Sequence, residues 1–305
     1  MATIEIDDVR LAYGDVTALD GLSVTFDPGF NVILGPNGSG KTTLFRVAAG
    51  VLPPDSGEAT IDGTNPIADP SVKTQVGYLP HGTPLNGQLT VRENLEYWGR
   101  VLGLDAKTRA ERIEETTAAM AVGGLLDRAA TDLSRGQRQR VTITRLLLGD
   151  PGVLFLDEPT TGLDPSAARA LRDQLDSLAS EGRTLCYSTH NLYEAELLAD
   201  ELVLIKAGRV VARGRKEELI GRLNGDGARE VRIETGADAE VFDRIGVEVR
   251  DVPDGWIVTL PEAQSVSDLI AALVEHGAAI EAVHEEETTL EDLYSQLTED
   301  EEVTG

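Results

Sequence analysis

The sequence from residue 35 to residue 42 is Gly35-Pro36-Asn37-Gly38-Ser39-Gly40-Lys41-Thr42, a glycine-rich turn between the apolar run NVIL and a helical segment that we expect to begin at Thr43. It matches the pattern G-x-x-x-x-G-K-[S/T] in the strand-to-helix setting that this pattern requires. The glycines let successive backbone N–H groups turn inward around a phosphate, and the helix N-terminus adds the positive end of its dipole. Lys41 can reach the β- and γ-phosphates, and the Thr42 hydroxyl can bind Mg²⁺. The stretch predicts a nucleotide phosphate site.

The chain around this turn alternates short apolar runs with segments of helical period. This alternation extends over residues 1–220 and predicts an α/β fold with a P-loop. The runs GVLFLD and TLCYST are continuous and apolar, which is typical of parallel strands buried on both faces. Residues 80–145 are largely polar and helical in period, so we expect a helical subdomain there.

The pattern changes after residue 220. Three glycines, an asparagine and an aspartate make residues 221–228 a predicted linker. The following segments REVRIET, GVEVRDVPDGWIVTLP, SVSDLIAALVEHG, AAIEAVHEE and TLEDLYSQL predict a strand, a hairpin, a helix, a strand and a helix. We therefore expect a small α+β accessory domain over residues 229–298 and a disordered acidic tail over residues 299–305.

Composition excludes several functions. The chain has 53 acidic and 27 basic residues, and its formal charge of −26 disfavours nucleic acid as a partner, because such binding needs basic side chains to neutralise phosphates. No apolar run reaches the ~18 residues of a membrane span. The start MATIEIDDVR lacks the basic and apolar regions of a signal peptide, and Cys186 is the single cysteine. These features predict a cytoplasmic protein.

The acidic excess also suggests a habitat. Only five of the basic residues are lysines, and self-repulsion among so many carboxylates is screened best at high salt. We interpret the protein as halophilic, that is, adapted to a cytoplasm with a high salt concentration. The alternative is an acidic protein from an organism with an ordinary salt concentration.

Two carboxylates follow the apolar run VLFL. Asp157 stands at the end of the predicted strand, where it can hold Mg²⁺ through water. Glu158 can orient and deprotonate an attacking water, a role that a kinase does not need. His190 closes the run TLCYST and can contact a γ-phosphate. Taken alone, the carboxylate pair would also fit an ordinary strand end, and a lone histidine there would also fit a structural role.

The segment Leu133-Ser134-Arg135-Gly136-Gln137 is similar to the LSGGQ signature of the ATP-binding cassette (ABC) ATPases. It precedes VLFLDEPTTGLDP in the order and spacing that this family shows. Residues 1 to about 220 therefore resemble the cassette of an ABC transporter, which implies a mixed sheet with a helical subdomain, ATP and Mg²⁺ as cofactors, and ATP hydrolysis coupled to transport.

The resemblance also implies roles for single residues. Tyr13 would stack on adenine, and Ser134 and Gly136, with Gln137 beside them, would meet the γ-phosphate of a nucleotide held by a second subunit. Asp164 would lie in the loop that communicates between the two sites, and His190 would be the switch histidine. Asp157 would be the Mg²⁺ residue and Glu158 the catalytic base.

A two-chain site is also reasonable on physical grounds. Ser134 is a good helix N-cap, and the helix start that it caps can bind an anion. One chain cannot easily present this start and its own P-loop to one nucleotide, whereas two chains arranged head to tail can. The resemblance implies that two ATP molecules hold this chain in a dimer with a second copy or with a sister chain. Hydrolysis would then let the dimer open, and its opening and closing would drive an integral membrane permease.

Two residues depart from the family pattern. Arg135 replaces a signature glycine, and we expect function to survive this change. His81 stands where the family usually has a glutamine that touches Mg²⁺, so His81 is a candidate metal contact, with a solvated loop residue as the alternative.

The C-terminal region resembles the appendix of multidrug-, polyketide- and sodium-type exporters. This resemblance favours export, with the chain peripheral at the inner face of the membrane. The segment around His81 resembles some haem-export cassettes, so haem or copper-related export is an alternative. A soluble, non-transport ABC ATPase is a further alternative, although the chain has one cassette and no long coiled coil between its P-loop and signature.

Overall fold

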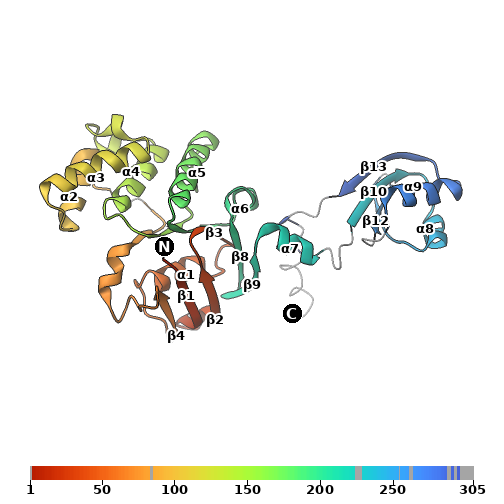
Figure 1. The fold of residues 1–305 in the computed structure, drawn as a ribbon, viewed down its shortest axis with the longest axis horizontal. Helices are drawn as coiled ribbons and strands as arrows, with labels where there is room; N and C mark the ends of the chain where they lie inside the picture. The colour runs from red at the N-terminus through yellow and green to blue at the C-terminus, as the bar shows by residue number, and fades with distance from the viewer. Residues whose placement is uncertain are drawn as a thin grey trace. The chain divides into compact units, whose positions relative to one another are not determined.

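The computed structural model describes residues 2–82, 85–223, 229–253, 255–260, 264–286, 290–291 and 294–295. The chain divides into two compact units, residues 1–215 and residues 216–305 (Figure 1). The boundary predicted at residue 220 falls inside a helix of the second unit, because the helix that starts at Lys216 continues to Leu223.

The first unit combines strands, which form two sheets, with helices. Its described strands are β1 (Ile4–Tyr13), β2 (Val16–Phe26), β3 (Gly29–Leu34), β4 (Ser56–Ile61), β5 (Val76–Leu79), β6 (Val153–Asp157), β7 (Thr184–Thr189), β8 (Glu201–Lys206) and β9 (Arg209–Gly214). Its described α-helices are α1 (Lys41–Ala48), α2 (Val91–Val101), α3 (Ala106–Ala119), α4 (Arg135–Leu147), α5 (Pro165–Ser180) and α6 (Leu192–Leu198). Three short 3₁₀ turns within the described residues lie at Pro70–Gln75, Gly123–Leu125 and Ala130–Asp132.

The larger sheet of this unit has the order β5-β6-β7-β3-β8-β9, with β9 antiparallel and the other strands parallel. Every residue of β6 and β7 is buried, as their continuous apolar sequences predict. In a parallel sheet the carboxyl ends of the strands meet at one edge, where such folds bind their ligands. The segments that follow β3, β6 and β7 therefore lie close together.

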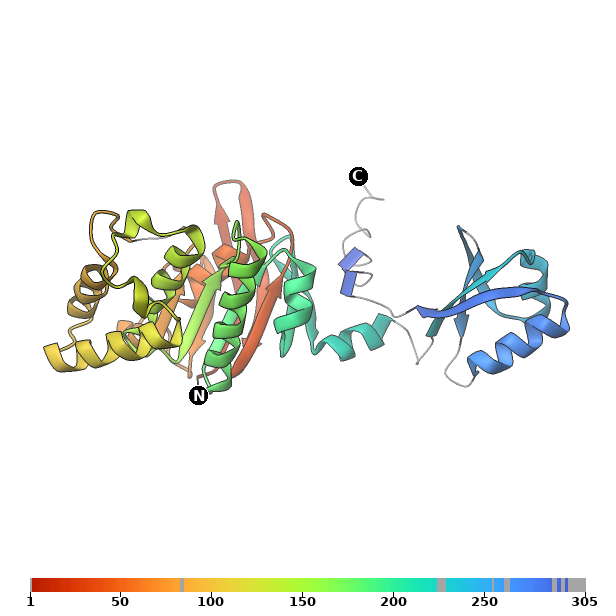
Figure 2. The ribbon, with the colours of Figure 1, turned by 90° about the horizontal axis from the view of Figure 1, so that it is seen from above.

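A second, antiparallel sheet has the order β2-β1-β4. Its inward side chains share a core with the larger sheet and α1; Ile4, Phe26, Phe45 and Phe155 in this core are fully buried. Figure 2 shows α5 lying along the larger sheet, which it contacts at β3. The mixed α/β fold expected from the sequence is confirmed.

Helices α2, α3 and α4 contact one another and form the expected helical subdomain, which Figure 1 shows at one end of this unit. Local capping explains where two of them start. Thr90 and Glu93 form a capping box at α2, and Asp105 accepts hydrogen bonds from two backbone N–H groups at the start of α3. No helix in the described part of the chain is long and apolar enough to cross a membrane.

The second unit contains a four-stranded antiparallel sheet among its described residues. Its elements are α7 (Lys216–Leu223), β10 (Arg229–Thr235), α8 (Ala239–Ile245), β11 (Glu248–Val252), β12 (Gly255–Leu260), α9 (Val266–Glu275) and β13 (Ile280–Glu286). The strand order β11-β12-β10-β13 and the succession βαββαβ are those of a ferredoxin-like fold. Val231 and Val258 of the sheet pack with Phe242 of α8 and Leu273 of α9.

The predicted strands, hairpin and first helix of this unit match β10, β11–β12, β13 and α9. Ser265 caps α9 by accepting a hydrogen bond from Asp268 N. Helix α8 is not evident from the sequence, because its seven residues are too few for a clear helical period. Residues 224–228 of the predicted linker, the tail 299–305 and much of the last predicted helix lie outside the described residues.

Candidate nucleotide site

The turn between β3 and α1 provides a backbone cradle. Gly38 and Gly40 have φ angles of 84° and 107°, in the left-handed region that favours glycine. A Cβ at Gly40 would lie 2.5 Å from the carbonyl oxygen of Ala18, so a side chain does not fit there. The helix starts at Lys41, slightly before the expected Thr43, because the chain turns at Gly40.

The start of α1 suits an anion. The first backbone N–H groups of a helix have no intrahelical partner. Among the described residues, no side chain caps α1, so these N–H groups are not occupied by a capping side chain. The neighbouring Ser39 hydroxyl is buried and has no hydrogen-bond partner within the described part of the chain. Unpaired donors at a helix N-terminus fit a group with several acceptor oxygens, such as the phosphates of a nucleotide.

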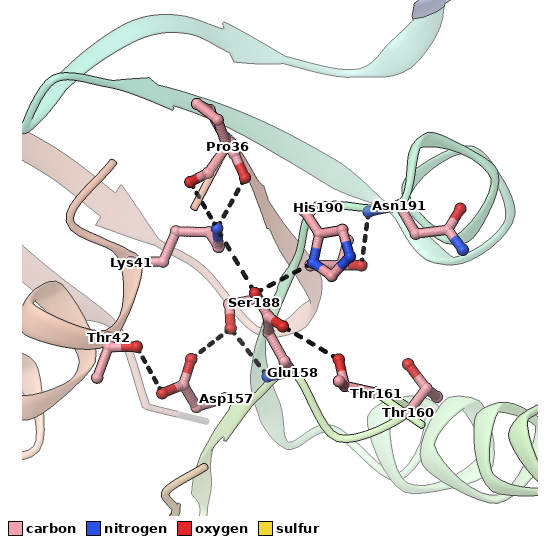
Figure 3. A network of polar contacts seen from close by, with 12 residues as sticks. Pro36, Lys41, Thr42, Asp157, Glu158, Thr160, Thr161, Ser188, His190 and Asn191 are labelled. Carbon is pink, nitrogen blue, oxygen red and sulfur yellow. Dashed lines mark hydrogen bonds and ion pairs between the residues drawn. The ribbon is translucent and has the colours of Figure 1, made fainter. Parts of the chain in front are cut away.

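Lys41 turns back onto the cradle. Its Nζ donates hydrogen bonds to the carbonyl oxygens of Gly35 at 2.7 Å and Pro36 at 3.0 Å, and lies 3.7 Å from Glu158 Oε1 (Figure 3). Burial lowers the pKa of Lys41, and the charges of Glu158 and Asp157 partly oppose this shift. A buried ammonium group therefore stands beside the cradle, bonded to carbonyl groups that a phosphate can replace as acceptors.

Asp157 joins three elements at the carboxyl edge of the sheet. Its Oδ2 accepts a hydrogen bond from Thr42 Oγ1 of α1 at 2.8 Å, and its Oδ1 accepts one from Ser188 Oγ of β7, also at 2.8 Å (Figure 3). Asp157 is buried, and Ser188 stands opposite it in the parallel register of β6 and β7. Carboxylate and hydroxyl oxygens are ligands that Mg²⁺ accepts, so Thr42 and Asp157 fit a magnesium site.

Glu158 adopts a backbone conformation that is rare for its residue type. Its φ is 47°, and a non-glycine residue in this left-handed region is strained, as is common at functional sites. Its Oε1 lies 3.2 Å from His190 Nδ1, and its Oε2 accepts a hydrogen bond from Thr161 Oγ1 at 3.0 Å (Figure 3). The structure thus brings Glu158 and His190 into direct contact.

The surroundings of Glu158 favour its charged form. Burial raises the pKa of its carboxyl group, but the hydrogen bonds from His190 and Thr161 and the charges of His190 and Lys41 outweigh burial, so the pKa lies below its ordinary value. The carboxylate is therefore ionised at neutral pH, where it can accept a proton.

Among the described residues, no hydrogen bond or ion pair joins Tyr13 or His81 to Lys41, Asp157 or Glu158. Tyr13 ends β1 and is exposed. Hydrogen bonding with Tyr78 raises the pKa of Arg46 in α1, burial of Arg46 partly opposes this shift, and Tyr13 adds a smaller upward effect. His81 is exposed in the segment after β5, and within the described residues it makes no hydrogen bond or ion pair with Thr42 or Asp157. The adenine contact and the metal contact stay predictions.

The signature segment starts a helix, as expected. Ser134 caps α4: its Oγ accepts a hydrogen bond from Gln137 N at 3.2 Å, and Gln137 Oε1 accepts one from Ser134 N at 3.1 Å. Gly136 is buried, and a Cβ there would lie 2.8 Å from Ala167 Cβ. Within the described part of one chain, no hydrogen bond or ion pair joins this segment to residues 35–42.

Arg135 and Asp164 border the loop that follows Glu158. The Arg135 guanidinium lies against Gly162, where a Cβ would be 2.3 Å from Arg135 Nη1. Asp164 caps α5 by accepting a hydrogen bond from Ala167 N at 2.9 Å. Arg135 is therefore directed at this loop within its own chain.

Two polar residues of the site were not predicted. Ser188 bonds to Asp157 and also accepts a hydrogen bond from Glu158 N at 3.0 Å, and Thr161 holds the Glu158 carboxylate. The signal for Ser188 is a hydroxyl near the carboxyl end of a buried strand, next to the strand that carries Asp157. Thr161 has no comparable signal, because its role depends on how the loop folds back.

Comparison with known proteins identifies the family. Residues 19–161 match the ABC transporter family. The daunorubicin resistance ATP-binding protein DrrA3 of Streptomyces coeruleorubidus is 34% identical over 305 aligned residues, which cover 97% of this chain and 96% of that protein. The chain belongs to the ABC transporter family. It is an ATP-binding cassette with ATPase activity, as the sequence resemblance implied.

Other similar proteins agree with this assignment. The Nod factor export ATP-binding protein I of Cupriavidus metallidurans is 40% identical over 222 residues, or 72% of this ABC chain and 73% of that protein. A solved ATP-binding subunit of an ABC transporter is 29% identical, with a TM-score of 0.65, and the match covers 73% of this chain and 93% of that one. A dimeric bacterial ABC transporter cassette is 25% identical, with a TM-score of 0.63, and the match covers 70% of this chain and 98% of that one.

Proposed function

We propose that the chain energises an exporter and that Glu158 is the base that activates the attacking water in ATP hydrolysis. The observation that carries this proposal is the placement of the ionised Glu158 carboxylate, 3.7 Å from Lys41 and 3.2 Å from His190. A base must lie next to the group whose proton it accepts, and this carboxylate stands beside the phosphate cradle. His190 orients the carboxylate and, on ATP binding, contacts the γ-phosphate.

The cradle of residues 35–43 holds the phosphates through backbone N–H groups and the Ser39 hydroxyl. Lys41 exchanges its bonds to the Gly35 and Pro36 carbonyls for bonds to the β- and γ-phosphates. Thr42 and Asp157 would hold Mg²⁺, which would neutralise charge on the phosphate oxygens. Tyr13 would stack on the adenine base, and His81 would contact Mg²⁺.

A second copy of the chain completes the site. Ser134, Gly136 and Gln137 of one chain contact the γ-phosphate held by the other, and Asp164 lies where the two sites communicate. Support comes from the exposed position of Ser134 at the start of α4 and from the dimeric cassette to which this chain is similar. The resulting assembly is a homodimer that closes when ATP binds and opens after hydrolysis.

The partner is an integral membrane permease, and the direction of transport is export. Relatives of this chain are named for Nod factor export and daunorubicin resistance. Helix α2 of the helical subdomain exposes the apolar residues Tyr97 and Val101, with Leu102 directly after the helix, and exposed apolar groups of this kind favour a protein partner. Bound to the permease, the chain lies at the cytoplasmic face of the membrane.

Co-purification tests the transporter assignment. Tagged Glu158→Gln chain is recovered from membranes of its own cell with ATP and KCl at about 1 M, which leaves a Debye length of ~3 Å and removes loose ionic contacts. We expect a stoichiometric protein with several membrane spans. Recovery of ribosomal or DNA-associated proteins alone would leave the ATPase intact and contradict transport. The Lys41→Ala chain, prepared in parallel, shows which partners depend on ATP.

We also propose that the chain is adapted to high salt, because its formal charge is −26. Self-repulsion of this size destabilises the compact state and is screened as salt rises. We expect a lower Tm and lower ATPase activity at about 50 mM KCl than at about 1 M KCl, with sucrose at matched osmolality as the control. Unchanged fold and activity at the lower concentration would contradict salt adaptation.

A further inference from the structure

A buried carboxylate outside the proposed catalytic group gathers several hydroxyl groups. Glu194 of α6 is 4% exposed, and its Oε2 accepts hydrogen bonds from Thr160 Oγ1 at 2.9 Å, Tyr187 OH at 2.9 Å and Thr189 Oγ1 at 3.0 Å. Its Oε1 accepts a hydrogen bond from Arg172 Nη1 of α5 at 3.2 Å. We call these five residues the Glu194 cluster.

The cluster is a fixed arrangement. A buried carboxylate is costly unless it is paired and hydrogen-bonded, and here Arg172 supplies the opposite charge while three hydroxyls occupy the other oxygen. Burial, and then the Glu194 charge, raise the pKa of Tyr187, so its phenol stays a neutral donor. Removing any one member takes a hydrogen bond from a buried polar atom, and this loss is costly. We therefore expect the cluster to resist rearrangement.

The members of the cluster border the Glu158–His190 contact on both sides. Thr160 lies in the turn that begins with Glu158, and Thr189 ends β7 directly before His190. Thr189 Oγ1 also accepts a hydrogen bond from Asn191 N at 3.0 Å, which fixes the backbone directly after His190. Figure 3 shows Thr160 and Asn191 on the two segments that carry Glu158 and His190.

We propose that Glu194 is a positioning residue for hydrolysis: it joins the turn that carries Glu158 to the strand end that carries His190, and so holds the carboxylate and the imidazole in contact. This inference rests on the proposed function of Glu158 and His190. Among the described residues, the side chains of the cluster make no hydrogen bond or ion pair with residues 35–42, and Thr189 meets this range through its backbone, where its carbonyl oxygen accepts a hydrogen bond from Gly35 N at 3.4 Å. Loss of Glu194 should therefore slow turnover and leave ATP binding intact.

Steady-state ATPase kinetics of the full chain test this role. Glu194→Gln keeps the shape of the side chain but directs an NH₂ group at either Arg172 or the hydroxyls. We expect kcat to fall by about tenfold and KM for ATP to stay within about twofold, because small misplacements of reacting groups lower the rate of the chemical step. Thr189→Val removes one hydroxyl at constant shape, and we expect a fall in kcat of about threefold.

Thr117→Val is the matched control. Thr117 is a buried residue of α3 whose hydroxyl donates a hydrogen bond to the carbonyl oxygen of Ile113 at 2.6 Å, far along the chain from the cluster. Like Thr189→Val, it removes a buried threonine hydroxyl at constant shape, but at a site outside the cluster, so its kcat should match that of the parent chain. Equal losses of kcat in these two variants would show a general effect on stability and overturn the positioning role.

Glu158→Gln separates failure of this inference from failure of the proposed function. If Glu158→Gln loses turnover while Glu194→Gln and Thr189→Val keep the parent kcat, only the positioning role is wrong. If Glu158→Gln retains turnover, the assignment of the base is wrong and the positioning role falls with it. Should Glu194→Gln fail to fold, Thr189→Val alone decides.

Discussion

Glu158→Gln lowers ATP turnover by about 10²-fold or more, the loss expected when a general base is removed. Glutamine preserves the size of the side chain and can still accept the hydrogen bond from Thr161 Oγ1, at 3.0 Å in the parent chain. It cannot take a proton from water at neutral pH. Because the cradle of residues 35–43 is unchanged, we expect the variant to bind ATP as the parent does.

The measurement is phosphate release per chain in saturating ATP, combined with equilibrium binding of ATP. Glu111→Gln is the control, since it makes the same substitution at an exposed site on α3. Turnover of Glu158→Gln close to that of the parent would show that the base lies elsewhere.

Lys41→Ala abolishes productive nucleotide binding, the second large effect. The buried ammonium makes two hydrogen bonds, at 2.7 Å and 3.0 Å, which we expect phosphate oxygens to take over. Charge-assisted hydrogen bonds contribute ~1.5–3 kcal/mol each, so losing two corresponds to a fall in affinity of at least about 10²-fold.

Titration calorimetry with ATP measures this loss, and circular dichroism shows whether the variant is folded. Lys107→Ala is the control, because Lys107 is an exposed lysine on α3 whose nearest charged partner is Glu111. An unchanged affinity of the Lys41→Ala chain would contradict the assignment of the phosphate site.

Sequence alone predicted the part of the site that depends on parallel strands. Asp157, Glu158 and His190 stand at the carboxyl ends of two buried apolar runs, and Lys41 and Thr42 follow the glycine-rich turn after a third. The carboxyl ends of parallel strands meet at one edge of a sheet. The structure places these five residues in one connected set of hydrogen bonds and ion pairs (Figure 3).

The rest of the site depends on contacts that no local pattern encodes. Thr161 reaches Glu158 only because the loop after β6 turns back, and Glu194 reaches Thr160 and Thr189 only because α6 packs beside that loop. The fold shows the same limit: the short helix α8 is held by the packing of Phe242 with α9 and the sheet of the second unit, a long-range effect that its seven residues do not reveal.

The molecular mass of the Glu158→Gln chain in solution, measured by light scattering with and without Mg²⁺ and ATP, is the most direct test of a site completed by two copies. We expect a dimer with ATP and a monomer with ADP, because only the γ-phosphate would bridge the P-loop of one chain and the signature of the other. The double variant Lys41→Ala, Glu158→Gln should stay monomeric with either nucleotide. A Glu158→Gln chain that binds ATP and yet stays monomeric would contradict a site completed by two copies.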